Sequence, residues 1–186
     1  MANPRRVAVF VGSLRRESLT RKAAKALCAL APASLACEMI EFGDLPLYNA
    51  DLETETPPPE WQRFRDRVRA CDAILFATPE YNRSLPGGLK NAIDVGSRPP
   101  GKSVFKGKPG AVISVSPGML GAFGANHAVR QAMVFLDVPM MQMPEAYLSN
   151  AGTLFDAEGN LANPSTREFL AKFMTAYAAW VERILR

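Results

Sequence analysis

Residues 73–94, AILFATPEYNRSLPGGLKNAID, join a short apolar run to a Pro- and Gly-rich loop and then to a helix-like segment. A continuous apolar run that ends in a loop is typical of a strand buried on both faces of a parallel sheet. The loop contains two prolines, which fix φ, and two glycines, which permit unusual φ values. Open α/β sheets bind ligands where their strands end, so this loop predicts a ligand site. An ordinary rigid turn is the alternative for this stretch alone.

The same order of strand and helix recurs about five times along the chain. Strands are expected at residues 7–11, 35–42, 72–77, 111–116 and 139–143. Helices are expected at residues 19–30, 61–70, 86–95, 125–136 and 166–185. This alternation predicts an α/β fold with a parallel sheet and helices on both faces. Five such units match the flavodoxin-like, doubly wound five-stranded sheet with strand order 2-1-3-4-5.

Size and composition favour one domain, residues 1–186. The chain is 48% hydrophobic, enough for a sizeable core, and no linker, repeat or low-complexity segment divides it. Its net charge is +4, but the lysines and arginines are scattered, which disfavours a nucleic-acid partner. No signal peptide is visible, and no apolar run is long enough to span a bilayer. We therefore expect a cytoplasmic protein without membrane insertion.

The cysteines and the histidine limit which sites the chain can build. Cys28, Cys37 and Cys71 are widely spaced, so neither a disulfide framework nor a metal site is predicted. His127 is the only histidine, and the hydrolase motif G-x-S-x-G is absent. We expect His127 to cap a helix or lie in an interface, and a role as a proton donor is the alternative.

A second unusual loop, residues 12–22 with the sequence GSLRRESLTRK, follows the first strand. It matches neither the Walker pattern nor the G-x-G-x-x-G pattern. It does place the hydroxyls of Ser13, Ser18 and Thr20 just before a helix N-terminus, where N–H groups and the helix dipole favour an anion. Arg15 adds a cation, and together these groups are suited to a terminal phosphate. One hydroxyl, from Ser18 or Thr20, is expected to cap the helix.

The predicted strand order brings the loops after the first and third strands together. A third loop, residues 116–124, follows the fourth strand beside them. A phosphate at the first loop and a flat ring against the second describe FMN. The backbone N–H groups of Glu80, Tyr81 and Asn82 would then face the polar edge of the ring, a contact that tunes flavin chemistry.

These loops together resemble the NADPH-dependent FMN reductase family, and most closely its branch that reduces quinones, chromate and azo dyes. The resemblance is carried by G-S-L-R at 12–15 with Ser18, P-E-Y-N at 79–82, P-G at 86–87 and L-K-N-A-I-D at 89–94. It implies bound FMN, hydride from NADPH or NADH, and a homodimer or homotetramer with the flavin near the subunit interface. By position, it implies phosphate contacts from Ser13, Arg15, Ser18 and Thr20, ring contacts from Pro79, Glu80, Tyr81 and Asn82, and closure of the far side by Ser116.

The chain departs from the family pattern at three positions. Thr20 replaces a common Asn, Arg83 a common aromatic residue and Val95 a common Trp. Arg83 and Gly121 are candidates for contacts to the acceptor or to NADPH. Arg83 is equally consistent with a solvated side chain.

The resulting interpretation is an NAD(P)H-dependent FMN oxidoreductase with a ping-pong mechanism. No side chain is expected to be catalytic, because N5 of the flavin would carry the hydride. The expected acceptors are quinones, with chromate, azo dyes, ferric complexes and free flavin as further small molecules. A flavodoxin-like electron carrier is one alternative, although such carriers tend to be acidic and this chain is basic. A non-catalytic FMN-binding sensor is another.

Overall fold

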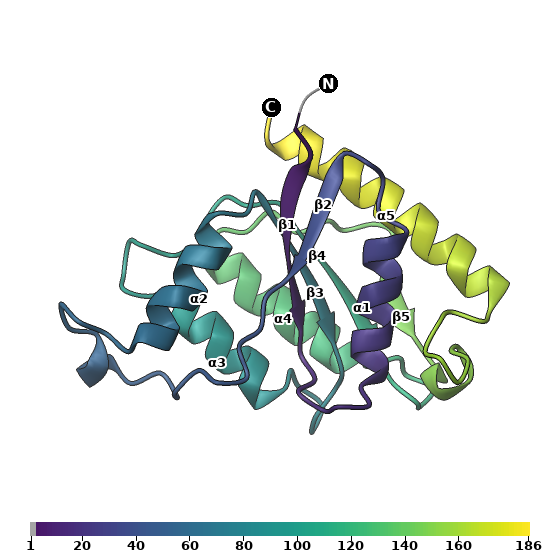
Figure 1. Cartoon of the computed structure of the whole chain (residues 1–186), viewed down its shortest axis with the longest axis horizontal. Coiled ribbons are helices and arrows are strands. Elements are labelled where there is room, and N and C mark those ends of the chain that lie inside the picture. The colour runs from purple at the N-terminus through teal and green to yellow at the C-terminus, as the bar shows by residue number, and fades with distance from the viewer. Residues whose placement is uncertain (1–2) are drawn as a thin grey trace.

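A parallel sheet of five strands lies at the centre of residues 3–186, the part of the chain that the computed structural model describes (Figure 1). The strand order is β2-β1-β3-β4-β5, and each neighbouring pair is parallel. The strands are β1 (Arg5–Val11), β2 (Leu35–Met39), β3 (Ala73–Thr78), β4 (Gly110–Val115) and β5 (Ala146–Leu148). The predicted flavodoxin-like fold is therefore confirmed.

Helices cover both faces of the sheet. They are α1 (Leu19–Ala29), α2 (Pro59–Arg69), α3 (Gly87–Gly96), α4 (Phe123–Phe135) and α5 (Pro164–Ile184), with short 3-10 helices η1 (Ala50–Leu52) and η2 (Ala151–Thr153). Buried side chains of α1 and α5 share one core, and those of α2, α3 and α4 share the other. Figure 1 shows α2 and α3 on the opposite side of the strands from α1 and α5.

The apolar runs become central strands because both of their faces are covered. In β1, Val7 and Val9 belong to the core beneath α1 and α5, whereas Phe10 belongs to the core on the other face. The Phe10 ring stacks on that of Phe76 in β3, with centroids 5.2 Å apart. A strand with two buried faces requires apolar residues at successive positions, which is the pattern that predicted a parallel sheet.

The fifth strand lies further along the chain than the predicted residues 139–143, so that prediction was wrong. Met140 forms only an isolated bridge with Gly110, and the ladder with β4 is formed by β5 instead. Between the bridge and β5 lies Pro144, which has no N–H group to donate to a ladder. Apolarity misplaced the strand because β5 is a short edge strand that is not fully buried.

A buried ion pair fastens the long segment between β2 and α2. Arg65 is 2% exposed, and its Nη1 and Nη2 atoms lie 2.9 Å and 2.6 Å from the two carboxylate oxygens of Glu53. Its Nε donates to the Val95 carbonyl at 2.9 Å, and its guanidinium lies 5.5 Å from the centroid of the Trp61 ring. The pair therefore links the segment around η1 to both α2 and α3.

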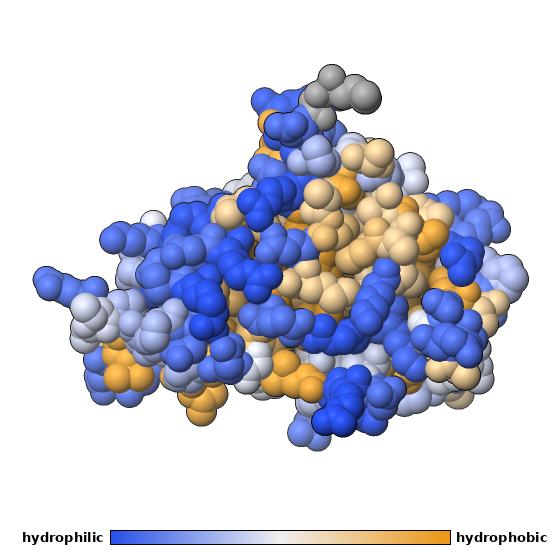
Figure 2. Space-filling model, in the orientation of Figure 1, coloured by the Kyte–Doolittle hydropathy of each residue, from blue (hydrophilic) through white to orange (hydrophobic). Residues whose placement is uncertain are grey.

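The surface is unevenly polar. Figure 2 shows hydrophilic residues over α2 and a less polar surface over α1 and β2. Among the helices of residues 3–186, none has both the length and the apolarity that crossing a bilayer requires.

Candidate active site

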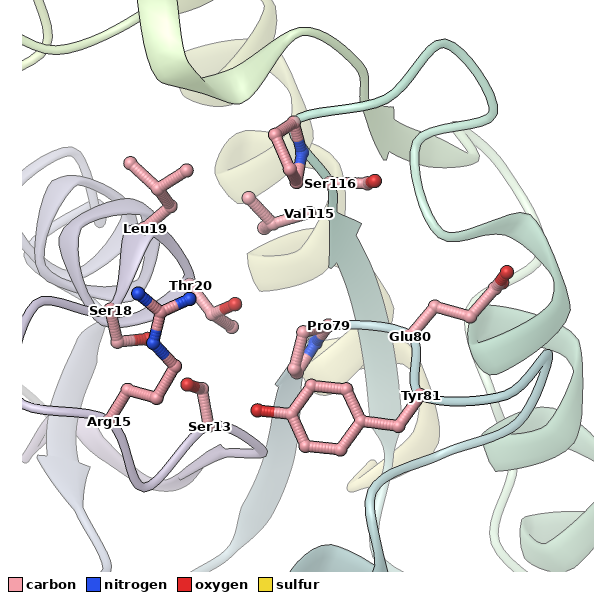
Figure 3. Close-up of a pocket in the computed structure, with 11 residues that line it drawn as sticks. Ser13, Arg15, Ser18, Leu19, Thr20, Pro79, Glu80, Tyr81, Val115 and Ser116 are labelled. Atoms are coloured by element: carbon pink, nitrogen blue, oxygen red, sulfur yellow. The ribbon is translucent and has the colours of Figure 1, made fainter.

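A pocket of about 310 Å³ opens at the carboxyl ends of β1, β3 and β4 (Figure 3). The loops after these strands form its walls, because neighbouring parallel strands end at the same edge of a sheet. It lies at the switch point of the fold, where the strand order reverses between β1 and β3. The lining residues are Ser13, Arg15, Ser18, Leu19, Thr20, Pro79, Glu80, Tyr81, Val115, Ser116 and Pro117.

Three hydroxyls form the side of the pocket contributed by the loop between β1 and α1. Ser13, Ser18 and Thr20 are all buried, as their 4%, 4% and 2% exposure indicates. Ser18 is the N-cap of α1, and its Oγ accepts a hydrogen bond from the Arg21 N–H group at 3.1 Å. The cap engages Ser18 alone, so Ser13 and Thr20 line the pocket without a capping role.

Positive charge surrounds these hydroxyls. Because α1 begins at Leu19, a lining residue, the N–H groups of its first turn and the positive end of its dipole face the pocket. Arg15 is exposed on the same loop, and Figure 3 shows its guanidinium on the same side of the pocket as the hydroxyls. Hydroxyls, helix N–H groups and a guanidinium together form the donor set of a phosphate site. The residues present therefore fit the phosphate of FMN.

The first and second loops approach each other closely at Gly12. A Cβ atom at this position would lie 3.1 Å from both Pro79 Cδ and Thr78 Oγ1, and 3.2 Å from Leu89. Such contacts are tighter than ordinary van der Waals contact, so a larger residue here would require its neighbours to move by a few tenths of an ångström.

The opposite side of the pocket is formed by the loop after β3. Figure 3 shows the Tyr81 ring directed into the pocket beside Pro79. Tyr81 and Ser84 exchange backbone hydrogen bonds of 3.0 Å in both directions, across a turn in which Asn82 and Arg83 have φ values of 52° and 63°. The Tyr81 N–H group is therefore occupied within the turn. The expected contact of the Glu80, Tyr81 and Asn82 N–H groups with a ring edge stays a prediction, with the Tyr81 group donating to Ser84 in this structure.

The Glu80 side chain points away from the pocket, towards α4 (Figure 3). Its carboxylate accepts a hydrogen bond from the Ala125 N–H group at 3.0 Å and pairs with the Arg83 guanidinium at 2.9 Å. The backbone of Glu80 thus belongs to the pocket wall, whereas its side chain joins the wall to a helix.

Three predicted residues do not line this pocket. Asn82 and Arg83 form the exposed turn beside it, and the Arg83 side chain is 74% exposed. Gly121 is buried with a φ of 56°, and a Cβ atom there would lie 2.8 Å from the Tyr147 Cβ. Gly121 is therefore required by packing, and its carbonyl accepts a hydrogen bond from the Ser114 hydroxyl at 2.7 Å.

A second pocket, of about 340 Å³, shares two residues with the first. Arg15 and Tyr81 line both pockets, and the rest of the second lining comes from Gly12, Leu14, Pro86, Gly87 and Gly88. The sequence reasoning did not identify Leu14 as a site residue, although it lies between two residues that were predicted. Arg15 and Tyr81 therefore lie between the two pockets.

His127 lies outside both linings, in a small cluster on α4 and β5. Its Nε2 lies 3.0 Å from the Tyr147 hydroxyl, and its ring centroid lies 4.2 Å from that of Phe123. Partial burial, with a smaller effect from Glu145, raises the pKa of Tyr147 to about 12. His127 does not cap α4, whose N-cap residue is Ala122 and which has no side-chain cap, so that part of the expectation was wrong, and a role in an interface stays a prediction.

The fold and the pocket define a class: a flavodoxin-like protein that binds a phosphorylated flavin. A flavodoxin of Pseudomonas aeruginosa shares the fold, with a TM-score of 0.58 and 20% identity, covering 95% of this chain and 99% of that one. Residues 5–153 match the NADPH-dependent FMN reductase family. The chain belongs to this family, and it is accordingly an oxidoreductase that uses FMN and NAD(P)H.

Its relatives include enzymes that act on quinones. A quinone reductase of Pseudomonas putida is 64% identical over 95% of this chain and 94% of its own length. A 2-hydroxy-1,4-benzoquinone reductase of a Burkholderia species is 43% identical over 95% of this chain and 96% of its own length. Among solved structures, the flavoenzyme NAD(P)H:(acceptor) oxidoreductase FerB from Paracoccus denitrificans is 43% identical, with a TM-score of 0.90, covering 96% of this chain and 98% of that one.

Proposed function

We propose that the protein is an NAD(P)H-dependent quinone reductase with FMN as its cofactor. The observation that carries this proposal is a single pocket that combines a phosphate-binding loop with a flat, aromatic wall at the switch point of the sheet. The named activities of the relatives at 64% and 43% identity support quinones as the acceptor class. Chromate, azo dyes, ferric complexes and free flavin are further candidates.

Bound FMN supplies the hydride-transfer chemistry between NAD(P)H and an acceptor. The protein's own contribution is to bind and orient the cofactor. Ser13, Arg15 and Thr20, with the N-terminus of α1, would hold the phosphate, and Ser18 would support them as the helix cap. Pro79 and Tyr81 would hold the ring, and Ser116 would close the far side of the pocket. All three residues line the pocket.

The co-substrate and the acceptor would approach from the exposed side of the pocket. Arg83 is a candidate contact for the negative charge of NADPH, since its guanidinium is exposed on the turn that follows Tyr81. Gly121 is a weaker candidate because it is buried against Tyr147. Both NADPH and NADH are compatible with this arrangement.

We also infer a homodimer or homotetramer in the cytoplasm. Val134 and Phe135 on α4 are 77% and 83% exposed, and a groove of about 190 Å³ lies between α3 and α4. Ile93 and Leu136 line this groove. An exposed apolar surface beside a groove is typical of a protein–protein contact, which supports association through α3 and α4.

The test is an absorption spectrum of the purified protein, reconstituted with FMN, before and after anaerobic addition of NADPH and then of a benzoquinone. We expect flavin bands that bleach with NADPH and return with the quinone. A flavin that NADPH does not bleach would instead indicate an electron carrier or a sensor. Failure to bind FMN would refute the proposed function altogether.

A further inference from the structure

Both carboxylate oxygens of Glu80 are occupied by groups from separate parts of the chain. Oε1 lies 2.9 Å from Nη1 of Arg83, and Oε2 accepts the hydrogen bond of the Ala125 N–H group at 3.0 Å. The Glu80 side chain is 11% exposed, whereas that of Arg83 is 74% exposed. The carboxylate is thus nearly enclosed between the turn after β3 and the first turn of α4.

The first turn of α4 has no side-chain cap of its own. Its N-cap residue, Ala122, has φ 62° and ψ 39° and cannot offer a side-chain oxygen. The Glu80 carboxylate accepts a hydrogen bond from the free N–H group of Ala125, which lies 45 positions later in the chain. It also places a negative charge at the positive end of the helix dipole. The flavin-binding loop and α4 are therefore joined by a long-range cap.

Gly124 allows this contact to be close. A Cβ atom at Gly124 would lie 2.9 Å from Glu80 Oε2 and 2.8 Å from the Arg83 carbonyl oxygen. Distances under 3.0 Å are not found for real Cβ atoms, so another residue here would displace the turn or the helix. The absence of a side chain at Gly124 lets the turn approach α4, and the hydrogen bond to the Glu80 carboxylate holds it there.

The turn held in this way carries the ring-binding wall of the pocket. Asn82 and Arg83 both adopt the left-handed conformation, which is unusual for an arginine, and the ion pair with Glu80 supports it. Tyr81, at the start of the turn, lines both pockets. A displacement of the turn would therefore move the Tyr81 ring and the Asn82 N–H group together.

We propose that Glu80 is a positioning residue that places the Tyr81–Ser84 turn for recognition of the flavin ring by fastening it to the N-terminus of α4. The inference rests on the proposed function, because it assumes that the ring lies against this turn. The hydroxyls that would face the phosphate belong to a different loop, whereas the Glu80 carboxylate bonds to Arg83 and Ala125. Loss of Glu80 should consequently weaken binding of the ring and leave the phosphate contribution intact.

The test compares the affinities of the apoprotein for FMN and for riboflavin, which lacks the phosphate, by quenching of flavin fluorescence. We expect E80A to weaken both about tenfold, so that their ratio is unchanged, and to shift the visible bands of bound FMN. E80Q should lose less, since an amide oxygen can still accept from Ala125, and R83A should resemble E80Q. E168A is the matched control, because Glu168 pairs with Lys172 at 2.7 Å on α5, away from the pocket.

Three outcomes would overturn the inference. One is an E80A protein with a lower Tm but unchanged flavin affinities and spectrum, which would make Glu80 a helix cap and nothing more. Another is a loss of FMN affinity without a loss of riboflavin affinity. If E80A does not fold, the third outcome is a riboflavin affinity and a flavin spectrum that are unchanged in both E80Q and R83A. A wild-type protein that binds neither flavin would refute the proposed function itself, whereas the three outcomes above leave flavin binding by the wild type intact.

Discussion

Replacing Arg15 with alanine should weaken FMN binding by removing a charged contact to the phosphate. A hydrogen bond to a charged group contributes about 1.5–3 kcal/mol. Arg15 is exposed, so solvent screening reduces this to about 1 kcal/mol. At 1.4 kcal/mol for each factor of ten, we expect the Kd for FMN to rise roughly fivefold. The Kd for riboflavin should change little, because riboflavin has no phosphate.

Arg16 provides the matched control for this experiment. It is exposed next to Arg15 and lines neither pocket, so R16A removes the same charge from almost the same place. Titration of the apoprotein with each flavin, at low and at high salt, measures the effect. The difference between the two variants should shrink at high salt, since exposed charges are screened. Equal losses in R15A and R16A, or equal losses of FMN and riboflavin in R15A, would refute the phosphate assignment.

Three further predictions concern stability. S18A should lower the free energy of unfolding by about 1 kcal/mol in urea denaturation, because Ser18 caps α1. E53Q should lower the free energy of unfolding by about 3–5 kcal/mol and lower the Tm, because it leaves the buried Arg65 guanidinium without its charged partner. A decrease of less than about 1 kcal/mol in the free energy of unfolding would contradict this prediction. The hydrogen bond from Arg67 is the largest of the effects that lower the pKa of Glu38 below its usual 4.5. Because the pKa is lower in the folded protein, this stabilisation is present above pH 4.5 and is lost as the pH falls through the lower folded value. Stability measured across this range should therefore fall less steeply in E38Q than in the wild type.

The patterns of apolar runs and loops predicted most of the fold, because strands and helix caps depend mainly on residues that are close together in the chain. The run before Thr78 and the one before Gly12 had to be buried on both faces, which only central parallel strands provide. The Ser18 cap in the loop after β1 was predictable for the same local reason, since a hydroxyl just before a helix can accept from its free N–H groups. The fifth strand was misplaced because β5 is a three-residue edge strand, whereas Pro139 and Met141 form backbone hydrogen bonds with Gly110, the first residue of β4, without continuing the ladder.

The side-chain roles at the ring wall were not predictable in this way. The sequence predicted backbone contacts from Glu80, Tyr81 and Asn82 to the ring, and the family resemblance implied ring contacts by position, but neither indicated where the side chains point. The side chains of Tyr81 and Glu80 diverge in the structure, the first into the pocket and the second to Ala125, which is distant in sequence. Local patterns thus determined the fold class and indicated the two loops that line the pocket, because periodicity and capping act over a few residues. Long-range packing determined which side chain faces the pocket, because the partner of the Glu80 carboxylate is brought near only when α4 docks on the sheet.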